Sequence, residues 1–197
     1  MKFLKKKKIL AIIPARGGSK RIPRKNIKEF CGKPMIAYAI SASKESGLFE
    51  HVVVSTDDEE IAQIARIWGA ETPFVRPSEL ADDHTATAPV VAHAIETCQA
   101  LGWQFDQVCC IYPGVPFIQI DDLNGALALM NLSQADYCFP VTEYPSVIRR
   151  ALKRLSNGEM QPFYPEFELI RTQDLESAYY DAGQFYWGKT QAWLTNS

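Results

Sequence analysis

The segment from Ala15 to Asn26 gathers side chains that are suited to holding a polyphosphate. It carries five cations within ten residues, namely Arg16, Lys20, Arg21, Arg24 and Lys25. Arginine can grip a phosphate through two parallel hydrogen bonds, whereas lysine acts as a point charge. Gly17 and Gly18 let backbone N–H groups approach a ligand closely, and Ser19 and Asn26 add neutral hydrogen-bonding groups. We therefore expect this segment to bind a phosphate-rich anion.

The segment matches neither of two common phosphate-binding fingerprints. It lacks both GxxxxGK[ST] and GxGxxG, so neither a P-loop ATPase nor a dinucleotide fold is predicted. A solvated basic loop is the alternative interpretation. However, the segment follows Ile9–Pro14, an apolar and β-branched run that is typical of a strand buried on both faces. Ligands of open α/β sheets bind at the carboxyl ends of such strands, which favours a binding site.

The elements that must position this loop alternate along the chain. Further strands are predicted at Val52–Val54, Glu71–Val75, Gln107–Tyr112 and Tyr137–Val141. Helices are predicted at 34–43, 57–69, 88–101 and 121–131, where apolar residues recur at helical spacing. Alternation of this kind predicts a three-layer α/β/α sandwich around a mostly parallel sheet.

The pattern changes after Tyr144. Asn157-Gly158 is a strong hairpin signal, and a strand-like pattern returns at 183–188. We therefore expect one domain over residues 1–197, in which 145–180 leaves the sheet as a small arm or flap and 183–188 rejoins it. Residues 1–8 are expected to form a basic leader.

Charge and composition exclude several classes of protein. Residues 1–33 hold twelve bases and one acid, whereas the remainder holds nine bases and 22 acids. This asymmetry predicts a local anion site and argues against a general nucleic-acid binder, in which the whole domain would be basic. No apolar run approaches the roughly 20 residues of a membrane span. The five cysteines show no CxxC spacing, which indicates reduced thiols and a cytoplasmic location.

Several segments together resemble a known family. Residues 12–27 have the sequence I-I-P-A-R-G-G-S-K-R-I-P-R-K-N-I. Residues 53–57, 76–83, 112–117 and 179–186 provide four shorter matches along the same chain. These segments closely resemble the motifs of the CMP-sugar-acid synthetases, the acylneuraminate cytidylyltransferases that act on sialic acid and its relatives. The resemblance covers residues 9 to about 190.

Two of these segments depart from the sialic acid enzymes and resemble the branch that acts on pseudaminic acid. Tyr112 replaces the Gln of their Gln-Pro-Thr-Ser-Pro turn, and Asp181–Trp187 replaces their Asn-Gly form. The resemblance implies a Rossmann-like nucleotidyltransferase sheet with a small dimerisation arm, and a homodimer. It also implies the reaction CTP + pseudaminate → CMP-pseudaminate + diphosphate, with Mg²⁺ or Mn²⁺. Another sugar acid, such as N-acetylneuraminate, legionaminate or Kdo, is the alternative substrate.

The resemblance also assigns roles to residues of this chain. It implies that Arg16, Lys20 and Lys25 offset charge on the phosphates during the reaction. The other nucleotide-binding residues that it implies are Ala15, Gly17, Gly18, Ser19, Asn26, Arg76, Thr87 and Tyr112. Gln184 and Tyr186 would line the side of the nine-carbon sugar acid.

Some of these residues have a plain structural alternative. Arg76 could be a surface arginine that fixes a turn, and Thr87 could cap the helix that starts at Ala88. Tyr112 and Tyr186 could be amphipathic core residues. Asp57 is expected to cap the second helix rather than to hold a metal ion.

The metal ligands that the resemblance implies belong to another segment. In this family the main metal carboxylates belong to a C-terminal segment with an Ile-Asp-x-Asp-like motif, which we expect to lie beyond Ser197. Asp181 is the nearest substitute within this sequence. A truncated form that binds CTP without turnover therefore stays open as a second function. A nucleic-acid binder is a third, disfavoured because residues 15–29 contain no aromatic side chain apt for base stacking.

Overall fold

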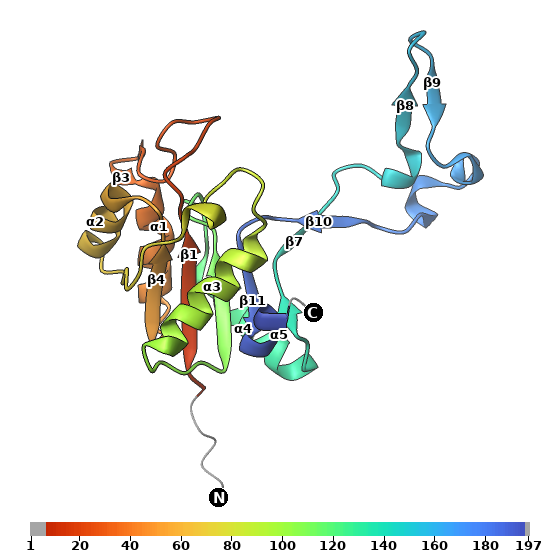
Figure 1. The fold of residues 1–197 in the computed structure, drawn as a ribbon. Helices are drawn as coiled ribbons and strands as arrows, with labels where there is room; N and C mark the ends of the chain where they lie inside the picture. The colour runs from red at the N-terminus through yellow and green to blue at the C-terminus, as the bar shows by residue number, and fades with distance from the viewer. Residues whose placement is uncertain (1–6, 196–197) are drawn as a thin grey trace, which may run out of the picture. The chain divides into compact units, whose positions relative to one another are not determined.

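The computed structural model describes residues 7–195, and its centre is a five-stranded sheet. The strands follow the order β4 (His51–Ser55), β1 (Ile9–Pro14), β5 (Gln107–Ile111), β11 (Phe185–Lys189) and β6 (Tyr137–Cys138). β1 pairs in parallel with β4 and β5, whereas β11 is antiparallel to β5 and β6 (Figure 1). The apolar run of β1 is buried because this strand lies inside the sheet, with helices over both faces.

Helices cover both faces of this sheet. On one face, α1 (Met35–Glu45), α2 (Glu59–Ile67) and α4 (Ile120–Ser133) pack against alternate residues of the strands, such as Ala11 and Ile13. On the other face, α3 (Thr87–Ala100) and α5 (Thr190–Thr195) pack against Leu10 and Ile12. The predicted three-layer sandwich is thereby confirmed, with a sheet that is mixed at β11.

One predicted strand is not formed and another is shorter than predicted, and proline explains both differences. Glu71–Val75 is not a strand, because only Glu71 forms a bridge, with Val53 of β4. Pro73 follows two residues later and has no N–H to continue a ladder. Tyr137–Val141 breaks at Pro140 for the same reason, so that β6 ends at Cys138 and Val141 begins a strand of another sheet.

Two short elements precede the helices α1 and α3. The hairpin of β2 (Glu29–Phe30) and β3 (Lys33–Pro34), which the sequence did not predict, lies between the basic loop and α1. A 3-10 turn, η1 (Ser78–Leu80), precedes α3. The N-terminal leader predicted over residues 1–8 lies almost entirely outside the described residues.

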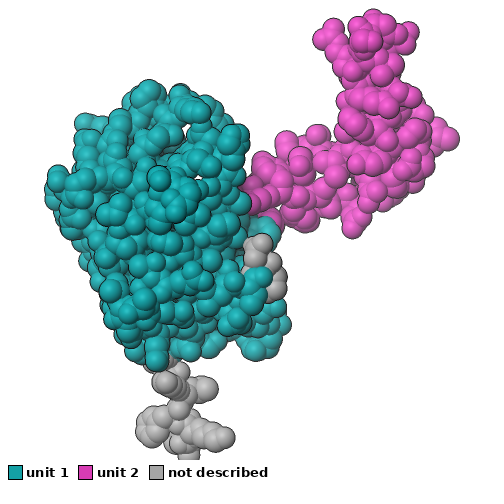
Figure 2. Space-filling view, viewed as in Figure 1, with its two compact units in different colours: residues 1–140, 184–197 teal, residues 141–183 magenta. Residues whose placement is uncertain are grey.

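The chain divides into two compact units, which Figure 2 colours separately. The second unit, Val141–Gly183, is built from two antiparallel pairs. One pair joins β7 (Val141–Glu143) to β10 (Tyr179–Asp181), and the other joins β8 (Leu152–Arg154) to β9 (Met160–Pro162). The predicted hairpin at Asn157-Gly158 is confirmed between β8 and β9, where Gly158 has φ 90°. Three 3-10 turns complete the unit, at Ile148–Arg150, Pro165–Phe167 and Thr172–Asp174.

Candidate nucleotide-binding site

The basic loop starts at the carboxyl end of β1, where β4 ends beside it. The Ala15 N–H donates to the carbonyl of Ser55 at 2.9 Å, which extends the pairing of the two strands. The Gly17 N–H donates to the Asp57 carboxylate at 3.0 Å. Asn26 is buried at the far end of the loop, and its Nδ2 donates to the Arg16 carbonyl at 3.0 Å. These bonds fix both ends of the loop at the edge where ligands of α/β sheets bind.

Arg16 and Lys20 share one carboxylate. Arg16 Nη2 lies 2.8 Å from Asp83 Oδ1, and the Lys20 ammonium contacts the other oxygen. Arg16 also donates to the backbone carbonyl of Asp82. The hydrogen bond from Lys20, aided by the charge of Arg16, lowers the pKa of Asp83. Asp83 therefore competes with any anionic ligand for two of the loop's cations.

The Asp82 carboxylate holds this acidic segment in shape. It accepts hydrogen bonds from the N–H of His84 at 2.9 Å and from the N–H and hydroxyl of Thr85 at 2.6 and 2.7 Å. These hydrogen bonds, first of all the one from the Thr85 hydroxyl, lower the pKa of Asp82. The tight turn that results places Asp83 opposite the loop.

Arg24 faces α2 instead of the acidic segment. Its guanidinium pairs with Asp58 and Glu60 at the start of that helix. The hydrogen bond from Arg24 lowers the pKa of Asp58. Within the described part of the chain, Arg21 and Lys25 have no ion-pair partner, so these two cations are available to a ligand.

Arg76 is buried, with 4% of its surface exposed, so it is not the surface arginine of the alternative interpretation. Its Nε donates to the Ser55 hydroxyl at 3.1 Å and its Nη2 to the Ser55 carbonyl. Burial lowers the pKa of Arg76 to about 10, against the opposing attraction of Asp57. A buried guanidinium at the end of β4 thus adds positive charge next to Arg16, which also contributes to lowering that pKa.

A second group of candidate residues meets around Tyr112. Its hydroxyl lies 2.9 Å from the Thr87 hydroxyl, and its N–H donates to the Gln184 carbonyl at 2.9 Å. The Tyr112 ring contacts the Tyr186 ring with 5.4 Å between centroids. Residues predicted for the nucleotide and for the sugar acid are therefore neighbours, because β5 and β11 are paired strands.

Neither the cap expected at Asp57 nor the alternative cap at Thr87 is formed. Thr87 is the first residue of α3, whose cap position is held by Ala86, so its hydroxyl is free to meet Tyr112. The cap of α2 is Asp58, which accepts from the Ile61 N–H at 3.0 Å. Asp57 holds the loop at Gly17 instead.

No cluster of metal-ligating side chains forms in the described part of the chain. Over residues 7–195, no three His, Cys, Asp or Glu side chains come close enough together to hold a metal ion. Asp181 belongs to the second unit, where its Oδ1 accepts from the Gly183 N–H at 2.7 Å. These residues therefore form no all-protein metal cage, whereas Mg²⁺ that binds with substrate phosphates is usually held by only one or two protein carboxylates.

Sequence reasoning missed the acidic partners of the loop. Asp57, Asp58 and Asp83 each bind it, yet the first of them stands 31 positions after Asn26, the last residue of the loop. For Asp57 and Asp58 the signal was present, because acids that directly follow a neighbouring strand lie at the same sheet edge as the cations. The parallel pairing of β1 with β4 brings these acids and the basic loop to that edge.

Comparison with known proteins identifies the family of this chain. A model of the cytidylyltransferase family matches residues 10–184, and the chain belongs to that family. It is therefore a nucleotidyltransferase. In the part of the chain that the structure describes, no helix is both long enough and apolar enough to cross a membrane.

Two relatives and one solved structure show what this chain is similar to in sequence and in fold. The chain is 46% identical over 187 residues to a pseudaminic acid cytidylyltransferase of Campylobacter jejuni, covering 95% of this chain and 81% of that protein. It is 38% identical over 122 residues to a CMP-N,N'-diacetyllegionaminic acid synthase of Legionella pneumophila, covering 62% and 53%. A CMP:2-keto-3-deoxy-manno-octonic acid synthetase complexed with CTP shares the fold, with a TM-score of 0.69, 19% identity and coverage of 96% and 77%.

Proposed function

We propose that this chain activates pseudaminic acid, by the reaction CTP + pseudaminate → CMP-pseudaminate + diphosphate. The observation that carries this proposal is the 46% identity, over 95% of the chain, to a protein named for that activity. The family match over residues 10–184 and the five cations in the loop after β1 support the proposal.

In the proposed reaction, the anomeric hydroxyl of the sugar acid attacks the α-phosphorus of CTP, and diphosphate leaves in line. The protein contributes positioning and charge stabilisation, as in phosphoryl transfer generally. Arg16, Lys20 and Lys25 would offset the charge on the triphosphate. When CTP binds, Arg16 and Lys20 would release the Asp83 carboxylate and contact phosphate oxygens instead.

The contacts of Asn26 support a place for the nucleotide. Its Oδ1 is buried and accepts no hydrogen bond from the described residues. Because buried acceptors are nearly always satisfied, a donor on the ligand would complete this side chain. Ala15, Gly17, Gly18 and Ser19 would cradle the phosphates with backbone groups, and Arg76, Thr87 and Tyr112 would complete the nucleotide's surroundings.

The sugar acid would bind on the β11 side of Tyr112. Gln184 and Tyr186 come from that strand region, and Phe139 lies against Tyr186 with 5.7 Å between ring centroids. An aromatic wall of this kind suits the apolar face of a deoxy sugar, while the amide of Gln184 supplies polar contacts.

The proposed cofactor is Mg²⁺, or Mn²⁺ in its place. The described residues gather no three carboxylates around one point, so such an ion would depend on oxygens of the nucleotide. Triphosphates bring Mg²⁺ with them through their own oxygens. Removal of divalent ions with EDTA should stop product formation, and an excess of Mg²⁺ should restore it.

Diphosphate release tests the proposal. Purified protein is mixed with CTP, Mg²⁺ and pseudaminic acid, and diphosphate is measured with a coupled enzyme. We expect turnover that Lys25→Ala nearly abolishes and that Lys28→Ala leaves intact. Lys28 is the matched control, because it is an exposed lysine only three residues away. The proposal would be refuted if none of the sugar acids supports diphosphate release at saturating Mg²⁺.

Competing substrates decide between the alternatives. If N-acetylneuraminate, legionaminate or Kdo supports faster turnover than pseudaminate, the chain serves that acid instead. Saturable CTP binding without any diphosphate release would favour a binding form without turnover. Nucleic acid is not expected to compete with CTP.

We also propose that the chain forms a homodimer through its second unit and acts in the cytoplasm. Many large apolar side chains of Val141–Gly183 are exposed, among them Leu152, Met160, Phe163 and Leu169. Exposed apolar side chains in such number are typical of a surface that binds another protein. Sedimentation should show a dimer, and Phe163→Ser with Leu169→Ser should shift it to the monomer. A cytoplasmic location suits the five free cysteines and the use of CTP.

A further inference from the structure

Arg24 is bound to α2 by a forked pair of contacts. Its Nη2 donates to Asp58 Oδ1 at 2.9 Å, and its Nη1 contacts the other oxygen of the same carboxylate. Nη2 also contacts Glu60. A guanidinium matched to a carboxylate in this way is the strongest and most directional kind of ion pair. The side chain is therefore committed to the protein rather than to a ligand.

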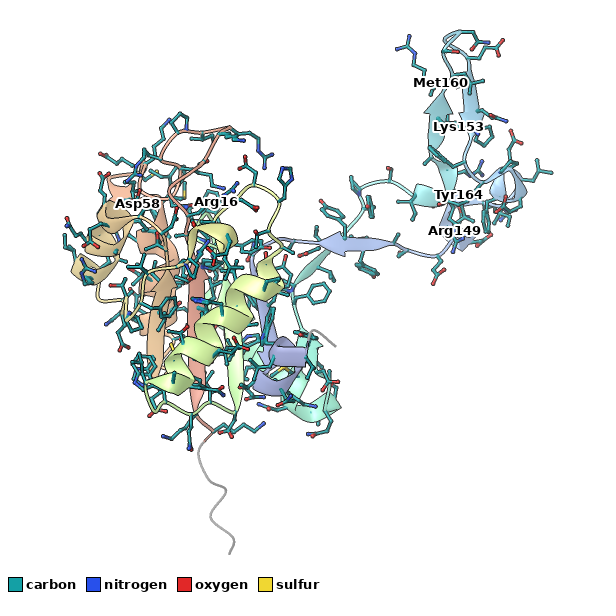
Figure 3. All side chains as sticks on the ribbon, viewed as in Figure 1. Arg16, Asp58, Arg149, Lys153, Met160 and Tyr164 are labelled. Carbon is teal, nitrogen blue, oxygen red and sulfur yellow. The ribbon has the colours of Figure 1, made fainter. Side chains whose placement is uncertain are left out.

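The Asp58 carboxylate is held from several directions. It caps α2 by accepting from the Ile61 N–H, and the Asp58 N–H donates to the Thr56 hydroxyl at 3.1 Å. It also lies against the start of the basic loop, because a Cβ added at Gly17 would come within 2.6 Å of Asp58 Oδ2. One carboxylate thus contacts the beginning of the loop at Gly17 and its end at Arg24. Figure 3 labels Asp58 beside α2 and Arg16 on the loop.

The backbone of Arg24 carries this restraint further along the loop. Its φ is 54°, in the left-handed region, and its carbonyl accepts from the N–H groups of Ile27 and Lys28 at 3.0 Å each. This turn contains Asn26, whose side chain holds the Arg16 carbonyl. A shift of Arg24 would therefore reach Asn26 directly and Arg16 through it.

We propose that Arg24 and Asp58 form a tie that positions Arg16, Lys25 and Asn26, and that Arg24 is a positioning residue rather than a phosphate ligand. This inference rests on the proposed function, since it concerns the same loop. It separates the five cations into those that meet CTP and one that shapes the loop around it. Glu60 assists the tie from its exposed position on α2.

Two variants break the tie from opposite sides while sparing the neighbouring structure. Arg24→Asn removes the guanidinium and keeps a residue that tolerates the left-handed region. Asp58→Asn removes the carboxylate charge and keeps a good helix cap. Arg66→Gln is the matched control, because Arg66 pairs with Glu59 on the same helix and does not contact the loop.

Each variant is measured by calorimetric titration with CTP and by steady-state kinetics. We expect Arg24→Asn and Asp58→Asn to weaken CTP binding by similar factors, about tenfold each. The double variant should bind CTP no more weakly than the single variant with the lower affinity, because both changes remove the same tie. KM for CTP should rise more than kcat falls, Arg24→Lys should recover part of the affinity, and Arg66→Gln should match wild type.

A direct contact between Arg24 and phosphate gives a different pattern. Asp58→Asn would then leave CTP binding unchanged or tighten it, because it frees the guanidinium, while Arg24→Asn would still weaken it. That result overturns the tie and leaves the proposed function intact. Wild-type protein that binds no CTP would overturn the proposed function itself, so the two failures are distinguishable.

Discussion

Gly17→Ala is the substitution for which the structure makes its most specific prediction. The new Cβ would lie 2.6 Å from Asp58 Oδ2 and 3.1 Å from Asp58 Cβ, whereas real Cβ contacts essentially never fall under 3.0 Å. Asp58 cannot turn aside freely, because Arg24 and the Ile61 N–H hold its carboxylate. Either the carboxylate leaves Arg24 or the loop moves away from α2.

The neighbouring glycine provides the control. A Cβ at Gly18 would meet no atom within 4 Å, and neither glycine has a positive φ. Both alanine variants therefore gain equally from a less flexible unfolded chain, and the difference between them isolates the clash. Overpacking of this kind costs about 1–3 kcal/mol, so the free energy of unfolding of Gly17→Ala should be lower than that of Gly18→Ala by this amount.

Urea unfolding followed by circular dichroism measures this difference. The two variants are compared at the same pH and salt, with slopes checked for equality so that the midpoints report stability. Equal stabilities would refute the reasoning, because they would show that the Asp58 carboxylate is not packed against Gly17.

Three further predictions concern charge and ionisation. Asp83→Asn should tighten CTP binding roughly two- to fivefold at low salt and less at high salt, which titration at two ionic strengths would show; weaker binding would contradict the competition that we describe. Under native conditions a thiol reagent should modify exposed Cys31 first, and should reach Cys110, whose pKa burial raises to about 12, only after unfolding; mass spectrometry of the labelled peptides checks this order. The lowered pKa of Asp58 means that its ion pair stabilises the fold above the unfolded value near 3.8 and is lost as the pH falls through the native value. Asp58→Asn should therefore flatten the acid end of the stability profile, and an unchanged slope there would contradict the pairing.

Local sequence predicted the parts of this fold that local chemistry determines. The apolar run of β1 and the glycine and cations after it lie within one stretch of chain, so the strand and the loop were predicted together. The Asn157-Gly158 turn was likewise predicted, because a left-handed turn needs such residues. Both depend on neighbours only.

The partners of the loop could not be predicted in the same way. Arg24 was counted among the ligand-binding cations, and only the placement of α2 beside the loop shows that it pairs with Asp58 instead. The contact between Asp83 and Arg16 joins residues that are far apart in the chain. Such pairs depend on how strands are ordered in the sheet, which periodicity alone does not give.

The central claim is that this cytidylyltransferase selects pseudaminic acid, and one competition experiment tests it most directly. Purified protein receives CTP, Mg²⁺ and an equimolar mixture of pseudaminate, legionaminate and N-acetylneuraminate, and mass spectrometry follows the products over time. We predict that CMP-pseudaminate forms first and in equal amount to the diphosphate released. A different CMP-sugar as the main product, or diphosphate release without any CMP-sugar, would contradict the account.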